Sequence, residues 1–199
     1  MISPNRIAAA LLCLSLGACV TQPLNDVPLV WKPTSELNFG GVDLSEARRS
    51  KIQFETFVDT RKQPALIAEN REDTIPKPVT TSGNVGEFVS TNVRQILDRA
   101  GLDTVDSDGD VIVSGEVRNF FVEETSLYEG TVLLHMTVRN RAGVTLWSGS
   151  ASGSAKRFGR SYSQENYYEV LSDALINATT TLVQDWDFRR ALAGQGSGR

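Results

Sequence analysis

The sequence contains few of the residues that carry metal and nucleophilic chemistry. Its 199 residues include one histidine, two cysteines and two methionines. A zinc site needs three or four His, Cys or carboxylate ligands, and a hydrolytic triad needs a histidine beside a nucleophile and a carboxylate. The single histidine, His135, falls on the polar face of an expected strand. We therefore expect no metal, no cofactor and no enzymatic activity.

Catalytic and phosphate-binding motifs are also missing. The chain has no P-loop and no G-x-G-x-x-G. A G-x-S-x-G motif would need a serine where Ala151 stands. Counted from Asp106 as the first position of a calcium loop, the glycine falls at the fourth position (Gly109) and not at the sixth. An acidic turn is the better interpretation of this segment.

There is no excess of basic residues. Lys and Arg number 20 and Asp and Glu number 24, which gives a formal net charge of −4. Nucleic-acid-binding domains usually carry a strong basic excess, so we expect no nucleic-acid partner.

The first 18 residues predict a signal peptide. Arg6 is followed by an apolar run, Ile7 to Ala18, that is too short for a bilayer span, because a crossing helix needs about 20 residues. Leu16-Gly17-Ala18-Cys19 then resembles the lipobox of bacterial lipoproteins. The alternative is an ordinary secretory signal followed by a chance cysteine.

The lipobox resemblance implies a lipid anchor on Cys19. In lipoproteins the cysteine thiol is linked to diacylglycerol, the signal is cut before it and the new amine is usually acylated. The resemblance thus implies a mature chain that begins at Cys19 and is anchored by acyl chains such as palmitate. Val20 stands where an Asp retains enterobacterial lipoproteins in the inner membrane. A valine at this position favours anchoring in the outer membrane, with the protein on its periplasmic side.

Residues 19–48 predict an extended tether. They carry Pro23, Pro28 and Pro33 and show little apolar periodicity. Fully stretched, 25 residues span about 80 Å, which would hold a domain away from the membrane. Leu29, Val30 and Trp31 interrupt the polar pattern, and we expect them to dock on the domain, with docking on a partner as the alternative. Residues 193–199 predict a flexible tail.

Residues 49–192 predict one α+β domain. Ile52, Phe54, Thr56 and Val58 form the inward face of a first strand, and a long connection over 59–82 has room for short strand pieces near residues 65–67 and 79–80. Asn84 and Glu87 mark the start of a helix, and Gly101 and Leu102 mark its end. Further strands are expected over 110–122, 131–140 and 144–155, and a last helix over 163–191.

The order β-α-β-β-β-α predicts a two-layer sandwich. Each strand has one polar face, so both helices should cover the same face of a mostly antiparallel four-stranded sheet. Serines, glycines and an alanine between Ser148 and Gly153 would let a helix approach this sheet closely.

One cluster is a candidate interaction site. Lys156, Arg157 and Arg160 surround Phe158 just after the last expected strand. Cations beside an aromatic ring suit anionic lipid headgroups, a cell-wall polymer or an acidic protein surface. A solvated loop is the alternative interpretation.

The whole layout resembles the YajG-like family of bacterial envelope lipoproteins. The shared features are Cys19, the first strand ending in Asp59-Thr60-Arg61, the helix ending in Asp98-Arg99-Ala100-Gly101-Leu102, three strands and a long last helix. The family has no catalytic motif to carry over. Together, the lipid anchor, the tether and a domain without a catalytic constellation predict a non-enzymatic outer-membrane lipoprotein that binds another envelope protein in envelope assembly, transport or maintenance.

Two other functions are compatible with the sequence. A carrier of lipid or another apolar ligand, such as an auxiliary subunit of an envelope transport system, would enclose a cavity of several hundred Å³ between sheet and helices. An unrecognised hydrolase would have a cleft that joins His135 to a serine and a carboxylate.

Overall fold

Three long antiparallel strands form the centre of the fold. The computed structural model describes residues 23–196, and in it β6 (Val111–Glu124), β7 (Tyr128–Asn140) and β8 (Thr145–Arg157) pair along nearly their whole length. Alternate residues of these strands are buried on one face and exposed to solvent on the other. This confirms the expectation that each strand has one polar face.

Five short strands extend the sheet beyond β6. β1 (Lys51–Phe54), β2 (Val58–Asp59) and β3 (Leu66–Asn70) lie parallel to successive parts of β6. β5 (Asp103–Val105) pairs with β1, and β4 (Lys77–Thr80) pairs with β3. The α+β class is confirmed, but the sheet is mixed and eight-stranded. The prediction of a mostly antiparallel four-stranded sheet is wrong on this point, because strands of two to five residues are too short to show a period.

The first expected strand is shorter than predicted. It ends at Phe54, and the alternation then changes phase, so that Phe57 is buried and Val58 is exposed. The ring of Phe57 lies against Gly115 of β6, where an added Cβ would approach the ring to 3.0 Å. The glycine opposite thus makes room for Phe57, and the sequence of the strand itself does not reveal this.

Helix α1 (Val85–Arg99) has the predicted ends. The Asn84 side chain accepts a hydrogen bond from the amide of Glu87. At the other end Gly101 has φ +83°, and the Leu102 amide donates to the Leu97 carbonyl. Both are standard helix-capping arrangements.

The last helical region consists of two helices. α2 (Gln164–Gln184) and α3 (Trp186–Leu192) are separated by Asp185, whose backbone is extended. The Asp185 carboxylate accepts from the amides of Asp187 and Phe188 and so caps α3. The single helix predicted over 163–191 is therefore wrong, since the Asp185 cap starts a new helix at Trp186.

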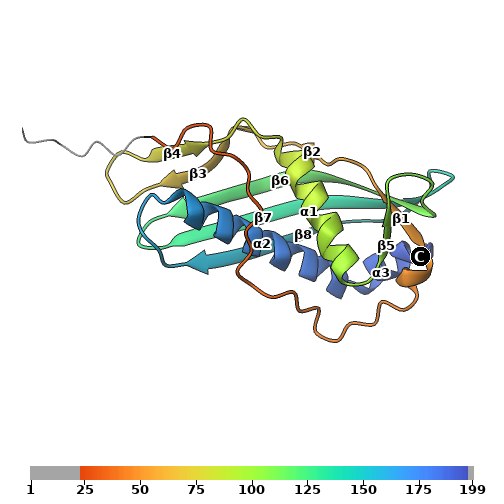
Figure 1. Ribbon diagram of the computed structural model, residues 1–199. Coiled ribbons are helices and arrows are strands. Elements are labelled where there is room, and N and C mark those ends of the chain that lie inside the picture. Colours follow the sequence, from red (N-terminus) through yellow and green to blue (C-terminus); the bar gives the residue numbers. More distant parts are fainter. Residues whose placement is uncertain (1–22, 197–199) are drawn as a thin grey trace, which may run out of the picture.

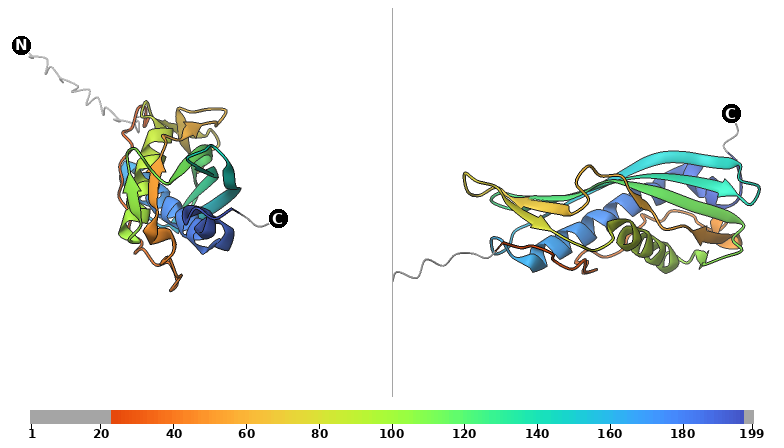
Figure 2. Two further views of the ribbon diagram at one scale, coloured as in Figure 1. Left: turned by 90° about the vertical axis from the view of Figure 1, so that its right-hand side faces the viewer. Right: turned by 90° about the horizontal axis from the view of Figure 1, so that it is seen from above.

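Both long helices cover the same face of the sheet. Figure 2 shows the strands as one layer and α1 and α2 side by side as the other. α2 lies directly on β7 and β8, and a Cβ at Gly153 would come within 2.1 Å of the backbone nitrogen of Ala178. The predicted two-layer arrangement is thus confirmed. None of the helices in residues 23–196 is long and apolar enough to cross a membrane.

Residues 23–46 form an extended segment, which we call the strap, that crosses the helical layer (Figure 1). Val27 pairs through its amide with the Thr80 carbonyl, Lys32 donates its amide to the Ser172 hydroxyl, and Leu44 is buried before the short helix η1 (Ala47–Arg49). The expectation of a free tether over 19–48 therefore does not hold from Pro23 onward. The docking expected of Leu29 and Trp31 is confirmed, since both pack against the core.

The signal peptide (1–18), Cys19 and residues 197–199 of the expected tail lie outside the described residues. Within the described part of the tail, the Gln195 side chain donates to Glu46 and accepts from Arg190.

Candidate functional site

The structure separates the basic residues of the predicted cluster. Lys156 pairs with Glu129 across the strands at 2.8 Å. Arg157 points to the helix side, where its Nη2 lies 2.5 Å from the nearly buried Glu169 of α2. Lys156 thus links β8 to β7, and Arg157 links β8 to α2. Phe158, 80% exposed, and Arg160 stay exposed in the loop between β8 and α2.

A buried carboxylate fixes this loop. Glu124, at the end of β6, is 1% exposed and accepts hydrogen bonds from the Tyr162 amide at 2.7 Å and from the Tyr167 hydroxyl. Tyr162 has φ +50°, a left-handed conformation that costs a non-glycine residue roughly 1–2 kcal/mol. The hydrogen bond to Glu124 helps to hold Tyr162 in that conformation.

Two tyrosines surround the carboxylate. The Tyr128 hydroxyl donates to the Arg160 carbonyl at 2.6 Å and accepts from the Ser163 amide. Its ring meets that of Tyr167 edge to face, with centroids 5.0 Å apart. Burial, and then the Glu124 carboxylate, raise the pKa of Tyr167 far above its usual range, and burial also raises the pKa of Tyr128.

Sequence reasoning missed this network, although a signal was present. Phe120, Val122 and Glu124 occupy consecutive inward positions of β6. A charged residue in the inward phase of a strand indicates a satisfied buried carboxylate. The strand was expected to end at Val122, which left Glu124 outside the pattern.

The same network holds the first described residues. The Leu24 amide donates to the Tyr162 hydroxyl at 2.8 Å, and that hydroxyl lies 3.4 Å from the Pro78 carbonyl of β4. Ser161 donates to Glu72 in the turn between β3 and β4. The turn 71–76, the loop 158–163 and the start of the strap at 23–24 are thus joined, and we call them the β3–β4 end of the molecule. They lie together at the left of Figure 1.

The strap is bound to α2 by a second carboxylate. Asp173 is 8% exposed and accepts from the amides of Thr34 and Ser35, each at 2.8 Å, and from the Thr34 hydroxyl at 2.6 Å. Lys32 pairs with Glu165 and Glu169 on the same helix. Acidic positions on α2 therefore bind the strap, and nothing in their helical spacing indicates the partner.

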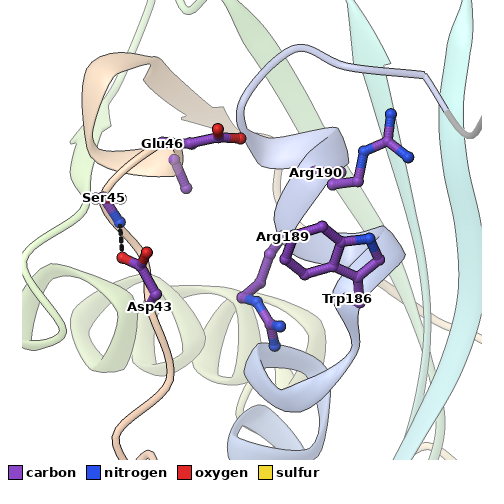
Figure 3. A pocket seen from close by; sticks show the side chains of 7 residues that line it. Asp43, Ser45, Glu46, Trp186, Arg189 and Arg190 are labelled. Carbon is purple, nitrogen blue, oxygen red and sulfur yellow. Dashed lines mark hydrogen bonds between the residues drawn. The ribbon is translucent and has the colours of Figure 1, made fainter.

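A small pocket of about 120 Å³ lies at the opposite end, between the strap and α3 (Figure 3). The Ser45 amide donates to Asp43 and lowers the pKa of that carboxyl. Arg189 stacks 5.3 Å from the Trp186 ring and donates to two carbonyls at the end of α2. Arg189 thus joins α3 to the end of α2, so the residues around the pocket mainly hold these elements together.

His135 lies on the open face of the sheet. Its Nδ1 is 3.1 Å from the Ser150 hydroxyl and its Nε2 is 3.3 Å from the Ser148 hydroxyl. Glu116, opposite His135 on β6, bonds to Arg118 instead. The structure thus brings the histidine to two serines, while among residues 23–196 no carboxylate hydrogen-bonds to it. The same residues contain no cluster of three His, Cys, Asp or Glu suited to a metal ion.

An open groove of about 520 Å³ runs between the strap and α1, lined in part by Pro28, Leu29 and Phe88. It lies on the surface. The space between α2 and β8, where the carrier hypothesis places a ligand, is filled by the direct contact at Gly153.

No protein-family model matches the chain, and no curated protein matches it. A solved structure does share its fold. A DUF330 protein from Xanthomonas campestris is 14% identical, with 67% of this chain and 81% of that chain covered and a TM-score of 0.52.

Two weaker structural likenesses are to a candidate lipoprotein from Caulobacter crescentus and to the lipoprotein GNA1162 from Neisseria meningitidis. The first is 13% identical over 64% of this chain and 92% of that chain, with a TM-score of 0.43. The second is 16% identical over 56% and 88%, with a TM-score of 0.36. Both structures are described as lipoproteins, but so weak a likeness carries no conclusion about this chain. It does not single out the YajG-like family.

Proposed function

We propose that this chain is a lipoprotein of the bacterial cell envelope, anchored through Cys19, whose domain is a non-enzymatic interaction module in envelope assembly, transport or maintenance. The observation that carries the proposal is Leu16-Gly17-Ala18-Cys19 directly after a short apolar run. The chain downstream of this motif folds into a domain, and the first contact described in it is the hydrogen bond from the Leu24 amide to the Tyr162 hydroxyl.

The polar face of the sheet supports a binding role. The outward residues of β8 include four serines, Ser148, Ser150, Ser152 and Ser154, beside His135, Thr131 and Thr137 of β7. Hydroxyl and imidazole groups on a broad open face suit a hydrated protein interface. His135 is solvated there between two serines, which supports a non-catalytic role for it.

The anchor is tested by comparing two cysteine variants of the full-length chain in a Gram-negative host. We expect Cys19→Ser to abolish acylation and membrane association, and Cys13→Ser, inside the expected leader, to leave both unchanged. Mass spectrometry of the N-terminal peptide and membrane fractionation measure these outcomes. An unmodified Cys19 thiol, or an intact leader on the mature protein, would overturn the proposal.

The location in the outer membrane is tested at Val20. We expect the wild-type protein to sediment with outer membranes in a sucrose gradient, and Val20→Asp to shift it toward the inner membrane. A wild-type protein found only in the inner membrane contradicts this part of the proposal.

The interaction role is tested by photo-crosslinking in intact envelopes. A photoreactive residue at Ser150, on the open face, should capture a specific envelope protein, whereas one at Glu36, which is exposed on the strap over the helical layer, should not. Recovery of no partner above background at Ser150 counts against a module that binds through this face. The carrier alternative has less support, because the groove near Leu29 is open and the core beneath α2 is filled.

A further inference from the structure

Few residues separate Cys19 from the first described contact that holds the chain to the domain. Four residue steps join Cys19 to Pro23, and these span at most about 14 Å when fully extended. The strap is fixed one residue later, where the Leu24 amide bonds to Tyr162 and the Leu24 carbonyl accepts from the Thr80 amide. A lipid on Cys19 would therefore place Leu24 within about 17 Å of the anchor point.

This reach decides which part of the protein lies nearest the bilayer. Leu24 belongs to the β3–β4 end, together with the turn 71–76 and the loop 158–163. The strands of 13 and 14 residues extend roughly 45 Å from there to the opposite end, where α3 and the turn after Asn140 lie (Figures 1 and 2). The far end thus lies well beyond the reach of the linker.

Of the large apolar side chains in residues 23–196, the two most exposed lie at the β3–β4 end. Ile75, in the turn between β3 and β4, is 78% exposed, and Phe158, in the loop after β8, is 80% exposed. The two segments are joined by the hydrogen bond from Ser161 to Glu72 and by Lys77, whose Nζ lies 5.9 Å from the centroid of the Tyr162 ring. Aromatic and aliphatic side chains at the tips of a fixed end suit insertion at a membrane interface.

Several basic side chains at the β3–β4 end form ion pairs with neighbouring carboxylates. Lys77 pairs with Asp73 at 2.7 Å, Lys156 with Glu129 and Arg71 with Glu69. Among the described residues the surface is therefore not a basic patch that requires anionic lipid. Contact with the bilayer would depend on the anchor and the apolar tips, with Arg160 left exposed at headgroup level.

We infer that the β3–β4 end is a membrane-docking surface, with Ile75 and Phe158 in the interfacial layer of the phospholipid bilayer that holds the Cys19 lipid. The inference rests on the proposed function, because it takes the anchor position from it. The domain then sits directly on the membrane and presents its opposite end, with α3, away from it.

The test uses the full-length acylated protein, purified in detergent and reconstituted into vesicles of phosphatidylethanolamine and phosphatidylglycerol. Acylated Cys19 has no free thiol and Cys13 is removed with the leader, so one introduced cysteine is the only labelling site. Ile75→Cys, Phe158→Cys and the control Val144→Cys, which is 57% exposed at the far end, are each labelled with an environment-sensitive fluorophore.

We expect the labels at 75 and 158 to shift to shorter emission wavelength and to be quenched by spin-labelled lipid. The label at 144 should show neither change. The same result in vesicles of phosphatidylcholine alone would agree with docking through apolar side chains, and quenching only with anionic lipid would overturn that mechanism.

Flotation of the vesicles separates failure of the inference from failure of the anchor. Protein that floats with the vesicles but shows no quenching at 75 and 158 overturns the docking surface and leaves the anchor standing. A blue shift without lipid quenching indicates contact with protein and also overturns the inference. Protein that lacks the acyl modification and does not float overturns the proposed function itself.

Discussion

At the scale of single residues, two buried carboxylates organise the surface of this protein. Glu124 holds the loop 158–163, and Asp173 holds the middle of the strap. Each accepts hydrogen bonds from backbone amides. In the unfolded chain, hydrogen bonds to water would replace them. A buried acceptor that loses its donors costs about 1–3 kcal/mol, so each site is sensitive to a change of a single group.

Tyr167→Phe should lower the free energy of unfolding at neutral pH and make it less sensitive to high pH. Loss of the hydroxyl removes a hydrogen bond to Glu124 and should lower the free energy of unfolding by about 1–3 kcal/mol near neutral pH. The pKa of Tyr167 is raised by burial, so above about pH 10 the unfolded state releases the phenol proton while the folded state keeps it. The wild-type protein should thus lose stability as the pH rises through this range, and the variant should lose less.

Urea unfolding at a series of pH values measures both effects. Tyr168→Phe is the matched control, since Tyr168 is only partly buried, and it should cost less. Equal slopes of stability against pH in the wild type and Tyr167→Phe would contradict the assignment.

Asp173→Asn should loosen the strap. The amide that replaces the carboxylate keeps one acceptor oxygen for three donors, so we expect a loss of about 1–3 kcal/mol and faster hydrogen exchange at Thr34 and Ser35. Glu36→Gln, an exposed change on the same segment, is the control and should be nearly neutral. If exchange at these two amides is unchanged, Asp173 does not hold the strap.

At the scale of elements, the sequence predicts what is long and regular. The ends of α1 at Asn84 and Gly101 and the alternation of β7 are confirmed, because each is specified by residues within a few positions. The change of phase at Phe57 and the break at Asp185 were missed. The change of phase depends on Gly115 of β6, which makes room for the Phe57 ring. The break depends on the Asp185 side chain, which caps α3 within an otherwise helical pattern.

Gly153→Ala should disrupt the packing of α2 on β8. The added methyl group would lie 2.1 Å from the Ala178 nitrogen and 2.2 Å from the Ala174 carbonyl oxygen, and neither backbone atom can move alone. Overpacking of this kind costs about 1–3 kcal/mol or more. Ser152→Ala, on the exposed face of the same strand, should be nearly neutral. Thermal unfolding compares the two, and equal midpoints would show that α2 does not lie this close.

At the scale of the whole molecule, the strap changes the expected relation to the membrane. A free tether of 25 residues would have allowed a separation of about 80 Å. Since the chain is fixed from Leu24 onward, only the few residues after Cys19 are left to separate the domain from an anchor.

Lengthening this linker should release the domain from the bilayer. A flexible Gly-Ser insertion of about ten residues after Gln22 adds roughly 17 Å of root-mean-square reach. We expect it to lower the lipid quenching of labels at 75 and 158 without changing flotation or stability. The same insertion between Gly196 and Ser197 is the control. Quenching that survives the N-terminal insertion would mean that the apolar tips bind the membrane without help from the short linker.

The sequence alone determined the α+β class, the ends of α1 and the polar face that carries His135, because each depends on local order or on a short period; the leader and the acylated Cys19 stay predictions from the sequence. Only the tertiary structure decided where the predicted residues meet. It divided Lys156 and Arg157 between two faces, buried Glu124 among tyrosines and bound the strap to Asp173. The contact between the strap and Asp173 joins residues more than a hundred positions apart in the sequence. Periodicity and local motifs along the chain do not show which distant residues come together.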